Sequence, residues 1–487
     1  MIQIECECIG EILLRQADQN PNHIALTFEN EKLTYKQLLC KTASLQQKIK
    51  EKVESGDVVL ICLPNSLLYI QAYFSITLLG AVVMPLYSAS SKVEIVQAFY
   101  AANATLLITT TEMKSEFNDL DIAILYLEEN QIHGIDIVPV YRPRNKNEVA
   151  LMLQTSGTTG NPKIVQLTHY NLLTNIQAHC ESLNLSKEDR VLITLPLPFG
   201  YCNTSQFLSH LYLGGQLVIM KGLFLPSSFM KIIRDQKITV VTTVPTMLQA
   251  ISMLKSDYKQ LPYLRYICFG GGQLTSKILE GVRRKLPQQV SMVQTYGQTE
   301  AGPRITTKVI QEVYYPANVG KPIRGVHIII KNENDETLKP LEQGDIWISS
   351  LSVMKGYYKN ELETSKVLLN GWLKTGDQGY LDEENNLWIT GRKKSIIKTG
   401  GKQVHPEEIE RLIMDHFPVE QVIVKGEADH FLGEILVAYI VPSHLNSVKE
   451  NEILQFCRLQ LSAYKVPKKV KIVSTLPKTP NGKIRRS

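Results

Sequence analysis

The sequence lacks the features that mark disulfide-rich, zinc-stabilised and exported proteins. Its eight cysteines form no CxxC or CxxH pair, so neither a zinc site nor a disulfide framework is predicted. The first ten residues, MIQIECECIG, contain no basic segment followed by an apolar core, so we expect no signal peptide. These absences favour a protein of the reducing cytoplasm.

An excess of charge of one sign is also missing. A net charge of +6 over 487 residues is too small to predict nucleic-acid binding. From Arg392 onward, however, 17 Lys and Arg stand against 10 Asp and Glu, a net of +7, so the rest of the chain carries −1. This basic tail is either a solvated surface or a docking face for a phosphate-bearing or acidic partner.

Charged residues are absent altogether from residues 58–86, a length that could span a bilayer. The run is interrupted by a Pro-Asn-Ser sequence near its start and by a glycine late in it. We therefore predict a buried βαβ unit and no transmembrane segment, with strands at 58–63 and 82–86 around a helix at 66–79.

Apolar, strand-like runs alternate with helical patterns through the first 300 residues. This alternation predicts an α/β fold: a large N-terminal domain of mostly parallel α/β subdomains, with a small β-rich section from about residue 318. A small C-terminal α+β domain is expected to follow. We place the boundary near 391–395, which divides the chain into residues 1–391 and 392–487. The elements predicted in the second part are helices at 406–416 and 449–461 and strands at 420–426, 434–441 and 470–473.

The segment QTSGTTGNPK, residues 154–163, crowds hydroxyl side chains and glycines ahead of one lysine. Glycines let backbone N–H groups approach a ligand closely, hydroxyls add further donors, and the lysine adds a positive charge. The pattern predicts a polyphosphate cradle, although its spacing is not that of the P-loop, GxxxxGK(S/T), and a plain surface loop is the alternative. The proposed donors are Thr155, Ser156, Gly157, Thr158, Thr159, Gly160 and Lys163.

Other segments carry residues suited to a nucleotide. Within QTYGQTEAG, Tyr296 could stack on a purine and Glu300 could hold Mg²⁺. Glycines at 270–272 end a predicted strand, where the backbone can approach a flat ring. Asp377 lies close to two glycines and suits a ribose diol. Lys483 lies in a Pro/Gly-rich terminal segment. Taken singly, each residue has a structural alternative, such as a turn, a solvated helix start or a frayed tail.

Taken in this order, the motifs resemble those of the AMP-forming adenylating superfamily, which includes acyl-CoA synthetases, adenylation domains of nonribosomal peptide synthetases and firefly-type luciferases. The resemblance runs from LTYKQLL at 33–39 to the final lysine motif. The phosphate loop and YGQTE are its most specific parts. The segment GRKKSIIKTGGKQVHPEEIE at 391–410 looks more like free-standing acyl-CoA ligases than peptide-synthetase modules.

The resemblance implies ATP- and Mg²⁺-dependent activation of a carboxylic acid to an acyl-adenylate, release of pyrophosphate, and transfer of the acyl group to a thiol. Such chemistry needs positioning and charge neutralisation more than a protein nucleophile. Lys483 would bridge the carboxylate and the α-phosphate, and Glu300 would hold Mg²⁺ with Thr155 or Thr299. The remaining nucleotide contacts implied are residues 155–160 and Lys163 at the β- and γ-phosphates, Gly271, Gly272 and Tyr296 at the adenine, and Asp377 and Arg392 at the ribose.

The resemblance also implies that the C-terminal domain rotates between the two half-reactions. Lys394 stands at the hinge position, where many relatives have aspartate and others lysine. Gly400 and Gly401 would face the thiol tunnel in the second state.

The segment LPLPFGYCNTSQF at 195–207 matches the acyl-pocket segment of the superfamily. Phe199, Tyr201, Asn203 and Gly302 would lie near the acid. No Asp or Glu occurs from 191 to 234 to pair with an α-ammonium group, and an unpaired buried ammonium would be costly. We therefore expect an aliphatic or aryl acid without an α-amino group.

The acceptor thiol is either coenzyme A, which we favour, or the phosphopantetheine of an acyl or peptidyl carrier protein. The lysines of YKVPKKVK at 464–471 suit the 3′-phosphate of the first or an acidic helix of the second. Three readings stay open at this point: a carrier-loading enzyme, a nucleotide-binding protein without catalysis, and a luciferase-like mono-oxygenase.

Overall fold

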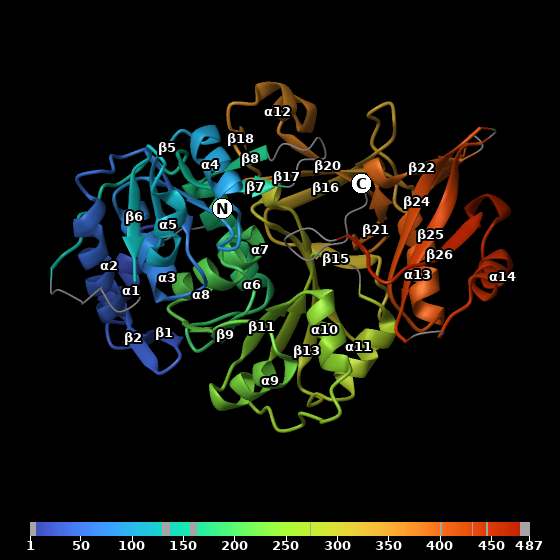
Figure 1. Cartoon of the computed structure of the whole chain (residues 1–487), viewed down its shortest axis with the longest axis horizontal. Coiled ribbons are helices and arrows are strands. Elements are labelled where there is room, and N and C mark those ends of the chain that lie inside the picture. Colours follow the sequence, from blue (N-terminus) through green and yellow to red (C-terminus); the bar gives the residue numbers. More distant parts are fainter. Residues whose placement is uncertain are drawn as a thin grey trace.

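The structure is a computed structural model that describes residues 6–128, 137–155, 163–272, 274–399, 402–430, 432–444 and 447–477. Three sheets organise the chain. In Figure 1 the first part of the chain lies at the left, strands β11–β13 with helices α9–α11 lie below, and the C-terminal strands and helices lie at the right.

The largest sheet has 14 strands and contains the predicted parallel α/β core. Its strands β13, β12, β11, β9, β10 and β1 are parallel neighbours in that order. They are β1 (Ile24–Phe28), β9 (Arg190–Ile193), β10 (Gln216–Ile219), β11 (Val240–Thr243), β12 (Tyr266–Phe269) and β13 (Ser291–Gly297), and β2 (Glu31–Thr34) closes one edge. The predicted α/β class is thereby confirmed.

Beyond β13 the same sheet becomes antiparallel, as predicted for the section from residue 318 onward. Its polar hairpin GYLDEENNLWITGR is present as the antiparallel pair β20–β21. The strands are β14 (Arg304–Ile310), β15 (Asn318–Pro322), β16 (Val326–Lys331), β17 (Gly344–Ser350), β19 (Leu368–Leu369), β20 (Trp372–Leu381) and β21 (Leu387–Arg392).

A seven-stranded sheet holds the predicted βαβ unit. Its strands are β18 (Gly356–Tyr357), β8 (Lys163–Thr168), β7 (Val149–Thr155), β4 (Val82–Pro85), β3 (Val58–Cys62), β5 (Ala104–Thr110) and β6 (Ile124–Leu127). Strands β3 and β4 are parallel, and all residues of the connecting helix α3 (Leu67–Leu78) are buried. A helix that is apolar all round belongs in a core, which explains the long uncharged run. Within the described residues, no helix combines the length and apolar character needed to cross a bilayer.

Helices cover and link these two sheets. Helix α6 begins with a capping box, since Thr168 and Asn171 exchange side chain–backbone hydrogen bonds of 2.9 and 3.0 Å. The helices are α1 (Glu11–Gln19), α2 (Tyr35–Ile49), α4 (Lys92–Ala101), α5 (Lys114–Phe117), α6 (His169–Ser182), α7 (Gly200–Cys202), α8 (Ser209–Leu213), α9 (Pro226–Asp235), α10 (Pro245–Ser252), α11 (Ser276–Arg283) and α12 (Glu361–Val367), with the π-helix η3 (Asn203–Leu208) between α7 and α8.

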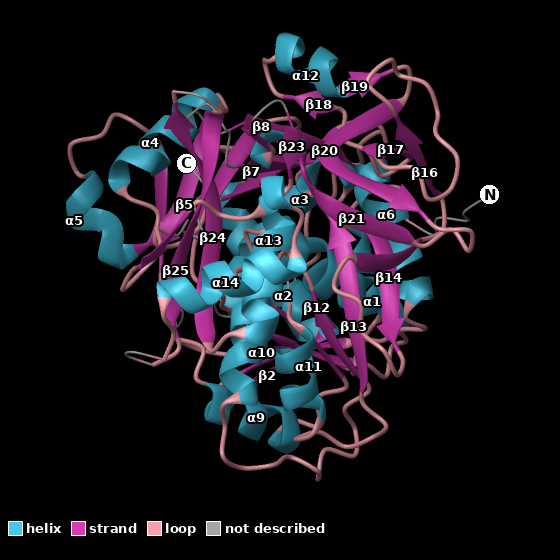
Figure 2. Cartoon of the chain, turned by 90° about the vertical axis from the view of Figure 1, so that its right-hand side faces the viewer, coloured by secondary structure: helices cyan, strands magenta, loops and turns pink. Residues whose placement is uncertain are grey.

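The C-terminal part has a sheet and a core of its own. Helices α13 and α14 pack on the sheet through Ile409, Ile413 and Ile453, and Figure 2 shows both helices beside β24 and β25. Each predicted element is found within three residues of its expected bounds. The elements are β22 (Ile397–Thr399), β23 (Lys402–Val404), α13 (Pro406–His416), β24 (Val419–Asp429), β25 (Gly433–Pro442), α14 (Glu450–Gln460) and β26 (Lys469–Ile472).

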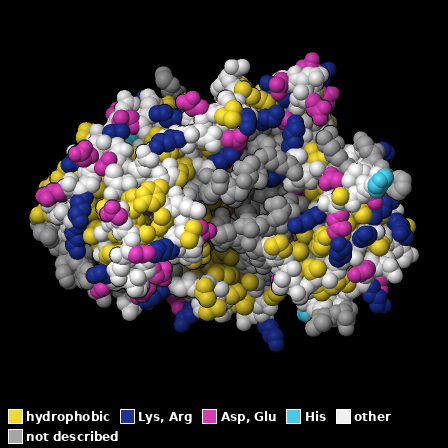
Figure 3. Space-filling view, turned by 45° about the horizontal axis from the view of Figure 1, so that its top comes forward, with side chains coloured by type: hydrophobic (Ala, Val, Ile, Leu, Met, Phe, Trp, Pro, Cys, Tyr) yellow, Lys and Arg dark blue, Asp and Glu magenta, His cyan; other side chains and the backbone are white. Residues whose placement is uncertain are grey.

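Basic and acidic side chains are intermingled on the face drawn in Figure 3, so the described side chains in that view present no continuous field of positive charge. None of the eight cysteines, all of which the structure describes, forms a disulfide, and every one except Cys40 is buried.

Candidate active site

Three strands bring a carboxylate, a phenol and a guanidinium together. Asp377 of β20 lies directly opposite Arg392 of β21 in the hairpin register. The hydroxyl of Tyr296, on β13, donates to Asp377 Oδ2 at 2.6 Å, and Arg392 Nε donates to Asp377 Oδ1 at 3.0 Å. The predicted ribose ligands and the predicted adenine neighbour are therefore in direct contact, although 81 residues separate Tyr296 from Asp377.

The electrostatics of this cluster follow from its burial. Asp377 is buried, while the side chain of Arg392 stays 67% exposed. Burial, followed by the neighbouring Asp377 carboxylate, raises the pKa of Tyr296 well above its usual value. The same carboxylate raises the pKa of Arg392. The phenol therefore remains a neutral donor, and the oxygens of Asp377 can accept further hydroxyl donors.

The predicted magnesium ligand and the predicted phosphate lysine share one aromatic neighbour. Tyr357, on β18, donates its hydroxyl to Glu300 Oε1 at 3.0 Å. Lys163 Nζ lies 4.6 Å from the centroid of the same ring, a cation–π contact. Within the described residues, no group of three or more acidic, His or Cys side chains could hold a metal ion. A divalent ion at Glu300 would therefore rely on substrate oxygens and water, which suits Mg²⁺.

Thr155 and Lys163 form the last described pair of the β7–β8 hairpin, and the Thr155 hydroxyl donates to the Lys163 carbonyl at 3.4 Å. The other members of the predicted cradle, Ser156, Gly157, Thr158, Thr159 and Gly160, lie outside the described residues. So do Lys483, Gly400 and Gly401. Lys394 lies in the short 3-10 turn Lys393–Ser395 between the two parts of the chain.

Lys163 is held by a carboxylate. Its ammonium group contacts Glu363 of α12, which also pairs with Lys366. The hydrogen bond from Lys163, followed by that from Lys366, lowers the pKa of Glu363 to about 2. The carboxylate therefore faces the lysine that the sequence predicts to bind phosphate, and it competes with an incoming anion for that charge.

Replacing Glu363 with glutamine should strengthen binding of MgATP and pyrophosphate by about 2- to 5-fold, the scale of a partly exposed ion pair. Because the pKa of Glu363 is lowered, its carboxyl group is ionised at every pH above the usual pKa of a glutamate. It loses its charge only as the pH falls towards about 2. The increase in affinity for MgATP and pyrophosphate should therefore be the same from pH 5 to 9 when binding is measured by calorimetric titration. Glu361→Gln, an exposed change on the same helix, is the control. Weaker binding of MgATP by Glu363→Gln would contradict the idea that Glu363 competes with phosphate for Lys163.

Glycines at the end of β12 leave room beside the cluster. Gly270 could not carry a side chain, because a Cβ would lie 2.6 Å from the Thr295 hydroxyl. Gly271 has a φ of +76°, which favours glycine, and both Gly271 and Gly272 are exposed. The exposed backbone here is open to a flat ring, as the sequence predicts.

The predicted acyl-pocket residues occupy different surroundings. The hydroxyls of Tyr201 and Thr295 are 2.8 Å apart, and Phe199 stacks on Tyr87 with ring centroids 5.7 Å apart. Asn203 is fully buried and donates to the Leu197 carbonyl at 3.3 Å, so it is a core residue at the start of the π-helix. Gly302, with φ +88°, has no room for a Cβ, which would lie 2.8 Å from the Ser352 carbonyl.

Sequence reasoning missed three residues of this region: Tyr357, Glu363 and Arg304. Tyr357 lies 57 residues from Glu300, and Glu363 lies 200 residues from Lys163. No local pattern reports such pairs. Arg304 directly follows the EAGP sequence at 300–303, and a charged residue so close to a predicted site motif was a signal that could have been used.

Comparisons with known proteins agree on one family. The family model described as AMP-binding enzyme matches residues 13–358, and the model for the AMP-binding enzyme C-terminal domain matches residues 408–483. A 2-succinylbenzoate–CoA ligase of Bacillus velezensis is 30% identical over 97% of this chain and 96% of its own length. A feruloyl-CoA synthase of an Amycolatopsis species is 30% identical over 98% and 97%.

Solved structures of o-succinylbenzoate coenzyme A synthetase from Bacillus subtilis are similar throughout. The complex with its acyl-adenylate intermediate has a TM-score of 0.87 and 28% identity, and covers 98% of this chain and 96% of that one. The complex with ATP and magnesium has a TM-score of 0.88 and 27% identity, covering 98% of both chains.

Proposed function

Because the chain belongs to the AMP-binding enzyme family, we propose that it joins a carboxylic acid without an α-amino group to coenzyme A. The chain is an AMP-forming acid–thiol ligase. It uses MgATP to convert a carboxylate to an acyl-adenylate with loss of pyrophosphate, and then transfers the acyl group to a thiol. ATP, magnesium and coenzyme A are the partners that its ligase relatives support.

One cluster carries the assignment of the nucleotide site: Tyr296, Asp377 and Arg392. Asp377 would accept the two ribose hydroxyls, since its carboxylate is buried and already aligned by two donors. Gly271 and Gly272 would border the adenine, and Tyr296 would lie against it. Each role is a proposal drawn from the motif and from this geometry.

The phosphate side of the site would use Thr155, Lys163, Thr299 and Glu300. A magnesium ion there would neutralise charge on the phosphates. Glu300 would hold it, with Tyr357 orienting the carboxylate through its hydroxyl. Lys163 would exchange Glu363 for phosphate oxygens. Lys483 would then neutralise the charge that develops between the attacking carboxylate and the α-phosphorus.

We further propose that residues 1–391 and 392–487 act as two domains and that Lys394 lies at their hinge. Support comes from the C-terminal hydrophobic cluster, which begins at Ile397 and is separate from the larger core. Rotation of residues 392–487 about this hinge would present different side chains of the C-terminal domain to the substrates in each half-reaction.

The acid is proposed to be aryl or aliphatic. The segment from 191 to 234 contributes no carboxylate, and Phe199 and Tyr201 present aromatic rings. A buried ammonium would find no anion among these residues. For the acceptor, coenzyme A is favoured by the ligase relatives, with a carrier-protein phosphopantetheine as the alternative.

The test is acid-dependent exchange of pyrophosphate into ATP, measured over aryl acids, short to long fatty acids and α-amino acids. We expect exchange with non-amino acids and an acyl thioester on addition of coenzyme A. Exchange with α-amino acids alone would overturn the pocket argument. Exchange without transfer to coenzyme A, but with transfer to a purified carrier protein, would replace the proposed acceptor.

A further inference from the structure

Arg304, the first residue of β14, is a fully buried arginine with unmatched donors. Its side chain is among the largest in the protein to be less than 2% exposed. Neither terminal guanidinium nitrogen, Nη1 or Nη2, has a hydrogen-bond partner among the described residues. Arginine cannot shed its proton in a protein, so the charge persists in this interior.

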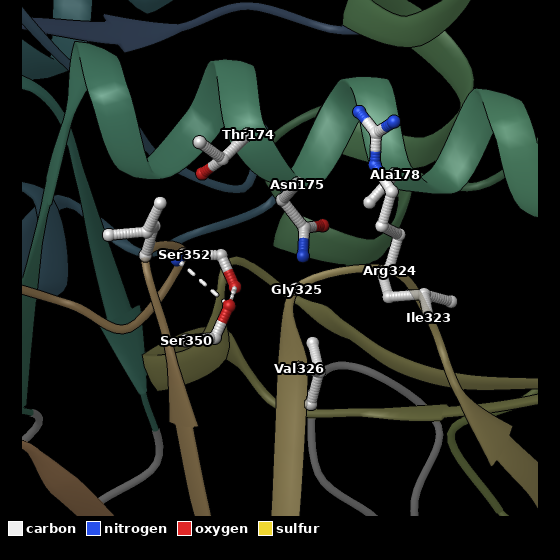
Figure 4. A pocket seen from close by; sticks show the side chains of 10 residues that line it. Thr174, Asn175, Ala178, Ile323, Arg324, Gly325, Val326, Ser350 and Ser352 are labelled. Carbon is white, nitrogen blue, oxygen red and sulfur yellow. Dashed lines mark hydrogen bonds between the residues drawn. The ribbon is translucent and has the colours of Figure 1, made fainter. Parts of the chain in front are cut away.

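The backbone of Arg304 is clamped in place. The side-chain amide of Asn175, on α6, accepts from Arg304 N at 3.1 Å and donates to Arg304 O at 2.8 Å. Figure 4 shows Asn175 pointing from α6 toward the strands, beside Ser352 and Gly325. Both backbone groups of Arg304 are therefore bonded to one amide of α6, which fixes the point of the fold from which its side chain begins.

Among the described residues, the side chains recorded as neighbours of the guanidinium are uncharged. Its carbon lies 5.5 Å from the ring centroid of Tyr201, a residue of the acyl-pocket segment. The positive charge also acts on Cys268 of β12 and His179 of α6, and burial keeps both uncharged. The acid on α6, Glu181, pairs with Arg324 instead.

Burying a charge without a counter-charge is costly, and native proteins rarely leave such a group unmatched without a use for it. A residue that destabilises the folded protein in this way fits a binding role better than a structural one.

We propose that Arg304 binds a second carboxylate on the acid substrate, at the end away from the carboxylate that is adenylated. This inference rests on the proposed function and adds the substrate class, a dicarboxylic acid. A guanidinium offers two parallel donors that match a carboxylate, and the pair Nη1 and Nη2 is free for it.

The geometry connects this site to the reaction centre. A Cβ on Gly200, next to Tyr201, would lie 3.9 Å from both the Thr299 hydroxyl and the Pro303 side chain. The acyl-pocket segment thus packs on the turn that runs from Glu300 to Arg304. One carboxylate of the substrate would lie near Thr299 and Glu300, and the other would pair with Arg304 beside the ring of Tyr201.

The experiment compares matched acids that differ by one carboxylate: hexanoate with hexanedioate, and 3-phenylpropanoate with 3-(2-carboxyphenyl)propanoate. Pyrophosphate exchange is measured for the wild type, Arg304→Met, Arg304→Lys and the control Arg324→Met, which removes an exposed guanidinium paired with α6. The wild type should favour at least one diacid over its monoacid partner by about 10-fold or more in kcat/KM.

In Arg304→Met this diacid-to-monoacid ratio should fall about 100-fold, and Arg304→Lys should keep part of it, while Arg324→Met should leave it unchanged. Thermal unfolding measured without ligands distinguishes a substrate-binding role of Arg304 from a structural role. Since the change removes an unpaired buried charge, Arg304→Met should unfold at the same or a higher temperature than the wild type.

A wild type that does not prefer any diacid, or a Met variant that loses stability while the ratio stays constant, would make Arg304 a structural residue and overturn the inference. Those outcomes would leave adenylation intact. Absence of exchange with every acid, mono- or dicarboxylic, would instead overturn the proposed function, and the inference with it.

Discussion

Replacing Asp377 with alanine should lower kcat/KM for MgATP about 100-fold or more, mainly through KM. The carboxylate accepts from both Tyr296 and Arg392, so its loss removes the acceptor for the ribose and leaves two donors unpaired. A factor of 100 corresponds to about 2.7 kcal/mol, which is within the range for hydrogen bonds to a charged, buried acceptor.

The measurement is pyrophosphate exchange over a range of ATP concentrations. Asp382→Asn is a matched control, because Asp382 lies on the same hairpin and accepts from Trp388 and Asn386. This control should reduce stability while leaving the KM for ATP near that of the wild type. A normal KM for ATP in Asp377→Ala would exclude this carboxylate from the nucleotide site.

Replacing Lys483 with alanine should lower the rate of adenylate formation about 100- to 1000-fold, the loss expected when one preorganised charge is taken from a transition state. Thioester formation from supplied acyl-adenylate and coenzyme A should stay near the wild-type rate, because the proposed rotation would give the second half-reaction a different arrangement of the C-terminal domain. The two steps are measured separately, by pyrophosphate exchange and by acyl-CoA formation from the synthetic adenylate.

The control for this pair of measurements is Lys468→Ala, an exposed lysine in the same C-terminal part of the chain. It should leave adenylate formation unchanged. Equal loss of both half-reactions in Lys483→Ala would remove the division of roles, and with it the reason for a rotating domain.

Much of the architecture follows from local patterns. The uncharged run at 58–86 was predicted as a buried βαβ unit because its turn residues interrupt it, and β3, α3 and β4 are found there. The elements of the C-terminal part were also predicted closely, because its amphipathic helices and alternating strands are short and well delimited. What the patterns could not provide was the order of strands, since pairing joins segments far apart in the chain.

The residues of the site divide in the same way. Glycine, hydroxyl and carboxylate residues at fixed spacing marked Gly271, Glu300 and Asp377, because a ligand's close approach limits which residues a short loop can hold. The residues that contact the site in the folded protein could not be identified from sequence spacing. Tyr357 and Glu363 belong to segments whose own composition is ordinary, and they matter only because β18 and α12 pack beside β8.

The sequence alone determined that this chain is built from parallel α/β units and that it carries the motifs of an adenylating enzyme, and it predicts which side chains meet the nucleotide. These properties depend on local spacing, which a single chain displays directly. The tertiary structure alone decided that Lys163 is held by Glu363, that Tyr296 donates to Asp377, and that Nη1 and Nη2 of Arg304 are buried without a hydrogen-bond partner among the described residues. Each of these depends on which strands and helices become neighbours, and long-range packing, not local propensity, sets that arrangement.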